Sequence, residues 1–94
     1  MEISIKLKKP VTVKGKPVTD ITLDFDKLTG NDMIQAEKEA RALGSGEASV
    51  FCSMRYQAII AAKVIGCPVD ELLELGAADF KNITQPAASF LLGQ

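Results

Sequence analysis

The chain has 94 residues, of which 47% are hydrophobic and 24% are charged, and it carries a formal net charge of −1 and no histidine. This length predicts a single domain spanning residues 1–94, and the hydrophobic content with low net charge excludes a disordered protein. The charge balance argues against nucleic acid as the main ligand, and the lack of imidazole removes the commonest general base and metal ligand.

The first 26 residues alternate between apolar and polar side chains, as in strands with one face buried and one face in water. The apolar positions are Ile3, Ile5 and Leu7 in the first run and Ile21, Leu23 and Phe25 in the second. The two runs predict an antiparallel hairpin over residues 2–26 that closes near Gly15 and Lys16.

An uninterrupted ladder would send the apolar residues of one strand to the wrong face. A two-residue turn would set Leu7 opposite Asp24. A one-residue bulge over residues 8–10 restores the pattern, because it pairs Leu7 with Leu23. A three-residue turn is the alternative, and it gives the same outer pairs.

The period changes to that of helices after residue 26, and four helices are expected. Thr29 followed three residues later by Asp32 predicts a capped start, and Gly44 and Gly66 are typical helix ends. Pro86 should kink or break the last helix. The expected helices span about 30–43, 47–65, 68–75 and 77–92. The sequence therefore predicts an α+β fold in which a bulged two-stranded hairpin packs on a bundle of three to four helices.

Three features that could carry chemistry have simpler structural explanations. The glycine-rich segment 44–46 follows a helix and lacks the lysine of a phosphate-binding loop, so it is interpreted as a linker. The hairpin lysines have no arginine or aromatic neighbour for base recognition, and aspartates on the second strand offset their charge. The acidic residues between 70 and 79 lie at helix starts, where the helix dipole stabilises carboxylates. We expect no nucleic-acid binding.

Catalysis and metal binding lack the residue types that they need. No serine or cysteine has a recognisable base beside it. Cys52 and Cys67 are too few for a zinc site, and we expect both to be small buried thiols. The sequence therefore predicts a protein that is not an enzyme and holds no cofactor and no metal.

The apolar segments are too short for a membrane. The longest block, residues 58–65, is interrupted by Lys63 and is far below the ~20 residues that cross a bilayer. The alternating residues after Met1 do not have the pattern of a signal peptide, so none is expected. With two thiols and no disulfide framework, the sequence favours a reducing cytoplasm and no membrane partner.

Several short motifs follow one another in an order typical of a known family. The stretch from Lys8 to Leu23 is similar to the pattern L-x-x-P-(V/I)-x-x-x-G-x-x-(V/I)-x-x-(L/I)-x-(L/F). Later landmarks are Thr29 to Asp32, Arg55-Tyr56, the alanine-rich segment to Gly66, Leu72 to Leu75, Ala78 to Phe80, and Phe90-Leu91. The chain thus resembles the phage tail assembly chaperones of Mu-like and P2-like contractile-tailed phages. It departs from them after the second strand, where Asp24 to Lys27 replaces a more basic segment.

The resemblance implies a non-catalytic protein of a phage or prophage. Such a protein binds the tape measure protein in the host cytoplasm during tail morphogenesis and is absent from the mature virion. The alternative is a structural component that forms a ring or joins the tail tube. A homo-oligomer would use the same apolar surplus, so the sequence does not separate the two.

A partner surface is expected where apolar residues of the long helix lie off its main stripe, together with the apolar residues near the end of the chain. These residues are Ile59, Ile60 and Val64 on the long helix and Phe90, Leu91 and Leu92 near the end of the chain. We expect the six to form one exposed patch on which a tape measure helix or a second subunit docks.

Overall fold

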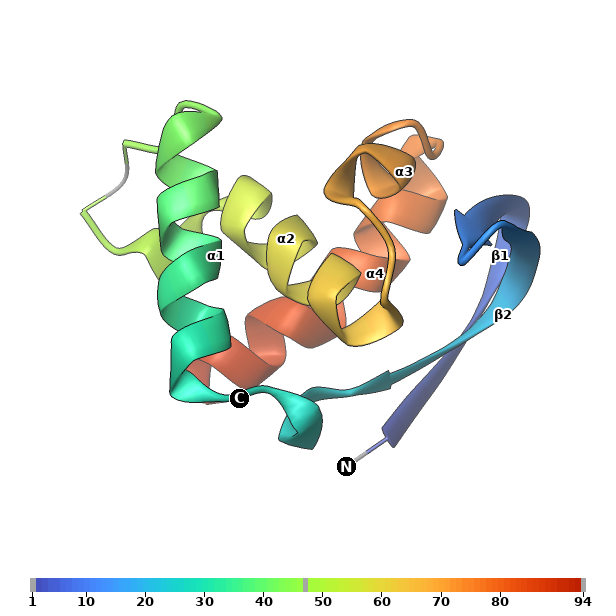
Figure 1. The fold of residues 1–94 in the computed structure, drawn as a ribbon, viewed down its shortest axis with the longest axis horizontal. Coiled ribbons are helices and arrows are strands. Elements are labelled where there is room, and N and C mark those ends of the chain that lie inside the picture. Colours follow the sequence, from blue (N-terminus) through green and yellow to red (C-terminus); the bar gives the residue numbers. More distant parts are fainter. Residues whose placement is uncertain (1, 47, 94) are drawn as a thin grey trace.

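The computed structural model describes residues 2–46 and 48–93 and has the predicted α+β architecture (Figure 1). Its elements are β1 (Glu2–Val13), β2 (Lys16–Asp24), α1 (Gly30–Ala42), α2 (Met54–Ile65), α3 (Val69–Leu73) and α4 (Ala77–Leu92), with short 3-10 turns η1 (Phe25–Lys27) and η2 (Val50–Cys52). The two strands form an antiparallel hairpin, and the four helices follow. This confirms the fold class that the alternating and helical patterns predicted.

Helix α2 is the centre of the molecule. It contacts α1, α3, α4 and β2, and Figure 1 shows it between α1 on one side and α3 on the other. Seven consecutive residues, from Tyr56 to Ala62, are buried. A helix surrounded on all sides must be apolar on all sides, which explains why its second half has no polar face.

The hairpin turn lies one residue earlier than the sequence analysis placed it. Val13 pairs with Lys16, and the two turn residues, Lys14 and Gly15, have positive φ angles of 52° and 81°. Positive φ at both positions is the geometry of a type I′ turn, whose twist matches that of the flanking strands. Glycine therefore occupies the second turn position, not the first.

The strand register also differs from the expected one. Leu23 pairs with Ile3, not with Leu7, and Ile5 pairs with Ile21. The irregularity lies between Lys6 and Val11, where the bulge was expected, but it is larger than one residue. It leaves residues 7–10 of β1 opposite the single residue 19 of β2. The apolar residues still face the core, because both registers pair odd positions with odd positions.

Helix boundaries follow local capping. The Thr29 side chain accepts a hydrogen bond from Asp32 N (3.2 Å) and the Asp32 carboxylate accepts one from Thr29 N (2.9 Å), which confirms the predicted capping box. The long helix does not begin at residue 47, which is outside the described residues, but at Met54. Ser53 caps it by accepting from Tyr56 N at 3.3 Å. Ser53 therefore caps the first turn of α2, and the helix begins later than the apolar pattern alone predicted.

The bounds of α3 and α4 lie closer to the predicted ones than the start of α2 does. Helix α3 spans five residues, shorter than the predicted 68–75. Helix α4 does not break at Pro86 but continues to Leu92, and Gly93 ends it in a left-handed conformation with φ 73°. Because proline has no N–H, the helix passes Pro86 with one backbone hydrogen bond fewer at the carbonyl of Asn82.

Candidate functional site

The six residues expected to form an exposed patch do not do so. Ile59 and Ile60 are 2% and 0% exposed and belong to the core, and Val64 is half-buried against it. Leu91 is 9% exposed, because it continues the buried face of α4 that Ile83 and Ala87 begin. Phe90 and Leu92 are 40% and 44% exposed. The single six-residue patch is therefore wrong, and two of its members remain on the surface at the end of α4.

Phe90 forms one wall of an apolar hollow of about 260 Å³, which we call the aromatic hollow. The Phe90 ring stacks on the Phe25 ring, with the ring centroids 4.9 Å apart and the ring planes at 10° to each other. Ile3 from β1 and Pro86 from α4 complete its apolar lining. Three segments distant in sequence, the start of β1, η1 and the end of α4, thus converge on one concave apolar site of the kind that accepts a large side chain.

A larger and shallower hollow of about 800 Å³, which we call the edge groove, adjoins the aromatic hollow. The two share Ile3, Pro86 and Ser89, so they form one continuous depression. The edge groove is lined by the four consecutive residues Ile3–Lys6 and by residues of α4 from Asn82 to Ser89. Successive side chains of a strand point to opposite faces, so a hollow that touches all four runs along the edge of β1.

The groove carries polar groups as well as apolar ones. Its lining residues include the polar Ser4, Asn82, Gln85 and Ser89 and the positively charged Lys6. The Asn82 carbonyl belongs to the same stretch of α4 and lacks its helical donor because of Pro86. A partner bound here would find an apolar anchor at one end and hydrogen-bonding groups along its length.

Farther along β1, acidic side chains cover the same edge. Asp79 is 3% exposed, and its carboxylate accepts hydrogen bonds from Lys8 N (3.1 and 3.0 Å to its two oxygens) and from Lys9 N (3.2 Å). The Glu71 carboxylate accepts one from Thr12 N at 2.8 Å. These residues of the acidic cluster therefore hold the bulged half of β1, a role that their placement at helix starts did not reveal.

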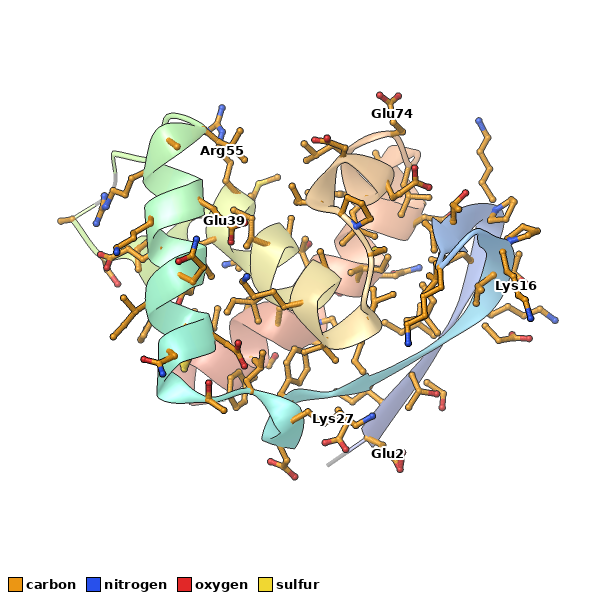
Figure 2. All side chains as sticks on the ribbon, viewed as in Figure 1. Glu2, Lys16, Lys27, Glu39, Arg55 and Glu74 are labelled. Atoms are coloured by element: carbon orange, nitrogen blue, oxygen red, sulfur yellow. The ribbon has the colours of Figure 1, made fainter. Side chains whose placement is uncertain are left out.

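The structure has a second exposed apolar area on the side of α2 and α3. Met54 and Leu73 are largely exposed there and line a hollow of about 410 Å³ with Cys52, Arg55 and Phe80. The Arg55 side chain extends outward in Figure 2. This area is more open and lacks the stacked aromatic pair of the aromatic hollow.

Among the residues that the structure describes, the titratable groups with shifted pKa values do not converge on one site. Burial raises the pKa of the Tyr56 hydroxyl, and the Glu37 carboxylate raises it further. That hydroxyl donates a hydrogen bond to the Met33 carbonyl at 3.2 Å. Burial also raises the pKa of the Cys67 thiol, with a smaller contribution from Glu71. Each shift has a local structural cause, and the two groups do not share a pocket.

Further features bear on the sequence-based expectations. The thiols are not both buried as expected: Cys52 is exposed and Cys67 is half-buried, because η2 carries Cys52 to the surface. Within the described residues, no three His, Cys, Asp or Glu side chains gather in a way that could hold a metal ion. Over the same residues, no helix has the length and hydrophobicity needed to cross a membrane.

Comparison with known protein families gives a match over most of the chain. A family model described as "Phage tail assembly chaperone proteins, E, or 41 or 14" matches residues 4–92. The match includes β1 from Ser4 onward, β2, the four helices and every residue that lines the edge groove except Ile3. Neither the curated proteins nor the solved structures contain a match.

Proposed function

The chain belongs to the phage tail assembly chaperone family, and we propose that its client is the tape measure protein. In this proposal the protein acts in the host cytoplasm during tail morphogenesis, performs no catalysis and is absent from the finished virion. The client is a long helical protein whose apolar stripes are exposed before assembly. A small domain that covers such a stripe would keep the client from associating with itself.

The aromatic hollow is the observation that supports this proposal most strongly. Phe90 is exposed although it stacks on the buried Phe25, and Leu92 is exposed nearby at the end of α4. An amphipathic helix recognises such a site by inserting one or two large apolar side chains, while its remaining turns lie along the adjoining groove. The contact is small, which suits a client that must later be handed over to tail tube subunits.

The test is co-expression with the tape measure protein of the same phage, followed by affinity capture. Phe90→Ser should reduce capture at least about tenfold, because an aromatic anchor at the centre of a contact carries much of its energy. Ile34→Ser is the matched control, since Ile34 is 58% exposed on α1 and does not line the aromatic hollow. Both variants should retain the far-ultraviolet spectrum of the parent.

Two results would contradict the proposal. Capture that is equal for the parent and Phe90→Ser would place the client elsewhere on the surface. Mass spectrometry of purified virions that finds the chain at a fixed ratio to the tube subunits would favour the structural ring or tube-joining component.

A further inference from the structure

The first half of β1 has an open edge. Side chains of α3 and α4 accept hydrogen bonds from β1 at Lys8, Lys9 and Thr12, but within the described residues no side chain does so at residues 2–6. The sheet has only two strands, and the edge groove separates this stretch from α4. An uncovered strand edge offers backbone donors and acceptors to another strand.

The residues of this open stretch are complementary to themselves. They read Glu2-Ile3-Ser4-Ile5-Lys6. In an antiparallel pair of two such stretches centred on Ser4, each Glu2 lies opposite Lys6 of the other copy and each Ile3 lies opposite Ile5. Opposite charges and apolar pairs at directly opposed positions are the combinations that stabilise antiparallel strands.

The faces of the strand agree with this pairing. Glu2, Ser4 and Lys6 are exposed, whereas Ile3 and Ile5 are half-buried against the core. Pairing would therefore put two ion pairs on the wet face and extend the apolar layer on the other. Glu2 lies at the end of the hairpin opposite to Lys16 (Figure 2), so the hairpin turn does not block it.

The hydrogen bonds to Asp79 limit how far a second strand can pair along β1. The hydrogen bonds from Lys8 and Lys9 to Asp79 close the edge immediately beyond the open stretch. A second strand can therefore extend no farther than about Leu7, and the midpoint of residues 2–6 is Ser4. The limit set by Asp79 bounds the pairing at one end, and within that limit the charge pattern selects the register centred on Ser4.

We propose that a second copy of this chain pairs with the open edge of β1 through residues 2–6, giving a two-fold symmetric, four-stranded sheet. This contact is isologous, because the same residues face each other across the axis. Five paired residues per chain make a small contact compared with a stable interface of about 1,200–2,000 Å². The dimer is therefore concentration-dependent. Residues 3–6 also line the edge groove in which the proposed client lies, so the client and the second copy compete for this stretch. The dimer itself does not depend on which tail protein the client is.

Charge reversal tests the register by sedimentation velocity over a concentration series from roughly 10 μM to 1 mM. Glu2→Lys or Lys6→Glu alone should weaken dimerisation at least about fivefold, because each places two like-charge pairs in the contact. The double variant should return to within about twofold of the parent. Glu2→Lys sets a lysine opposite Asp24 in the same hairpin, so loss of the dimer in this variant is not explained by a weakened fold. Lys6→Glu sets a glutamate opposite Asp20, so its effect on dimerisation is compared with its thermal unfolding.

Cross-linking provides a readout that does not rely on charge. In a Cys52→Ser background, Ser4→Cys should form a disulfide-linked dimer on mild oxidation, because the two residues meet at the symmetry axis. Thr22→Cys is the control, since Thr22 is exposed opposite Ser4 but lies on the other strand. A parent that is monomeric throughout the series would overturn the inference. So would a dimer unaffected by either reversal, or cross-linking that is equally fast at both positions.

Discussion

The two halves of β1 belong to one strand but are built differently. Its second half, from Lys8 to Thr12, contains the bulge and gives its outward N–H groups to the carboxylates of Asp79 and Glu71. Its first half, from Glu2 to Lys6, pairs regularly with β2 and borders a groove. The closed half ties the hairpin to α3 and α4, whereas the open half leaves backbone groups for another chain.

This difference separates residues that stabilise the fold from residues that are available for contacts. A buried acceptor, Asp79, is needed where the bulge frees the partly buried N–H groups of Lys8 and Lys9. No such need exists where the edge meets solvent in a groove. Substitutions in the closed half should therefore change the stability of the monomer, and substitutions in the open half should change association.

The largest effect is expected for Asp79→Ala. The substitution leaves the bulge N–H groups of Lys8 and Lys9 without their acceptor, and it should lower the free energy of unfolding by about 2–4 kcal/mol. Urea denaturation followed by circular dichroism measures this change. Asp79→Asn keeps the shape and one acceptor oxygen, so its free energy of unfolding should lie between those of the parent and Asp79→Ala. A loss below about 0.5 kcal/mol for Asp79→Ala would mean that the closed half does not stabilise the fold.

The end of α4 shows the same contrast between neighbouring residues. Leu91 is buried and Leu92 is exposed, so Leu91→Ala should cost about 2–3 kcal/mol and Leu92→Ala less than about 0.5 kcal/mol. Thermal unfolding of both variants distinguishes them. Equal losses would show that Leu92 is part of the core and would remove it from the proposed client surface.

A smaller effect is expected for Glu71→Ala. Its hydrogen bond to Thr12 N is exposed, so water can replace the carboxylate, and the loss should be about 0.5–1 kcal/mol. The measurement is again urea denaturation, with Glu74→Ala as the control because Glu74 is exposed on the same segment and extends away from the body of the protein in Figure 2. If Glu74→Ala lowers the free energy of unfolding as much as Glu71→Ala does, the effect comes from the change in net charge and not from the hydrogen bond between Glu71 and Thr12 N.

The smallest effect concerns Cys67. Burial raises the pKa of this thiol, and the Glu71 carboxylate raises it further, so the thiolate fraction at a given pH is lower than for an ordinary cysteine. In a Cys52→Ser background, Glu71→Gln should move the pH midpoint of thiol labelling to lower pH and speed labelling at pH 8 by about two- to threefold. An unchanged midpoint would show that Glu71 does not lie close enough to Cys67 to act on it.

Local signals in the sequence predicted local structure well. Thr29 and Asp32 form their capping box within one turn, and Gly66 ends α2 in a left-handed conformation, because such features depend on neighbouring residues. The predicted start of α2 was wrong because the apolar pattern continues on both sides of Ser53, the residue that caps the helix. Its hydroxyl is buried against that of Ser45 at 2.6 Å, a contact that no periodicity predicts.

Distant contacts account for the rest. The size of the bulge depends on Asp79, which is 71 positions from Lys8. Similarly, Ile59 and Ile60 lie off the main stripe of α2 and were interpreted as surface, but β2, α1, α3 and α4 pack around that helix. A helical pattern shows which residues share a face and not how many faces are covered. Phe90 was predicted as a surface residue from its place near the end of the chain. Its neighbours in the aromatic hollow, Phe25 and Ile3, were not predicted because they come from the other end of the chain.

The most direct test of this account is amide hydrogen exchange along β1, measured residue by residue by NMR at low and high protein concentration. The amides of Lys8, Lys9 and Thr12 should be protected equally at both concentrations, because their acceptors lie in the same chain. The outward-facing amides within residues 3–6 should exchange rapidly when dilute and become protected when concentrated. Uniform, concentration-independent protection along the whole strand would contradict the division of β1 into a closed and an open half.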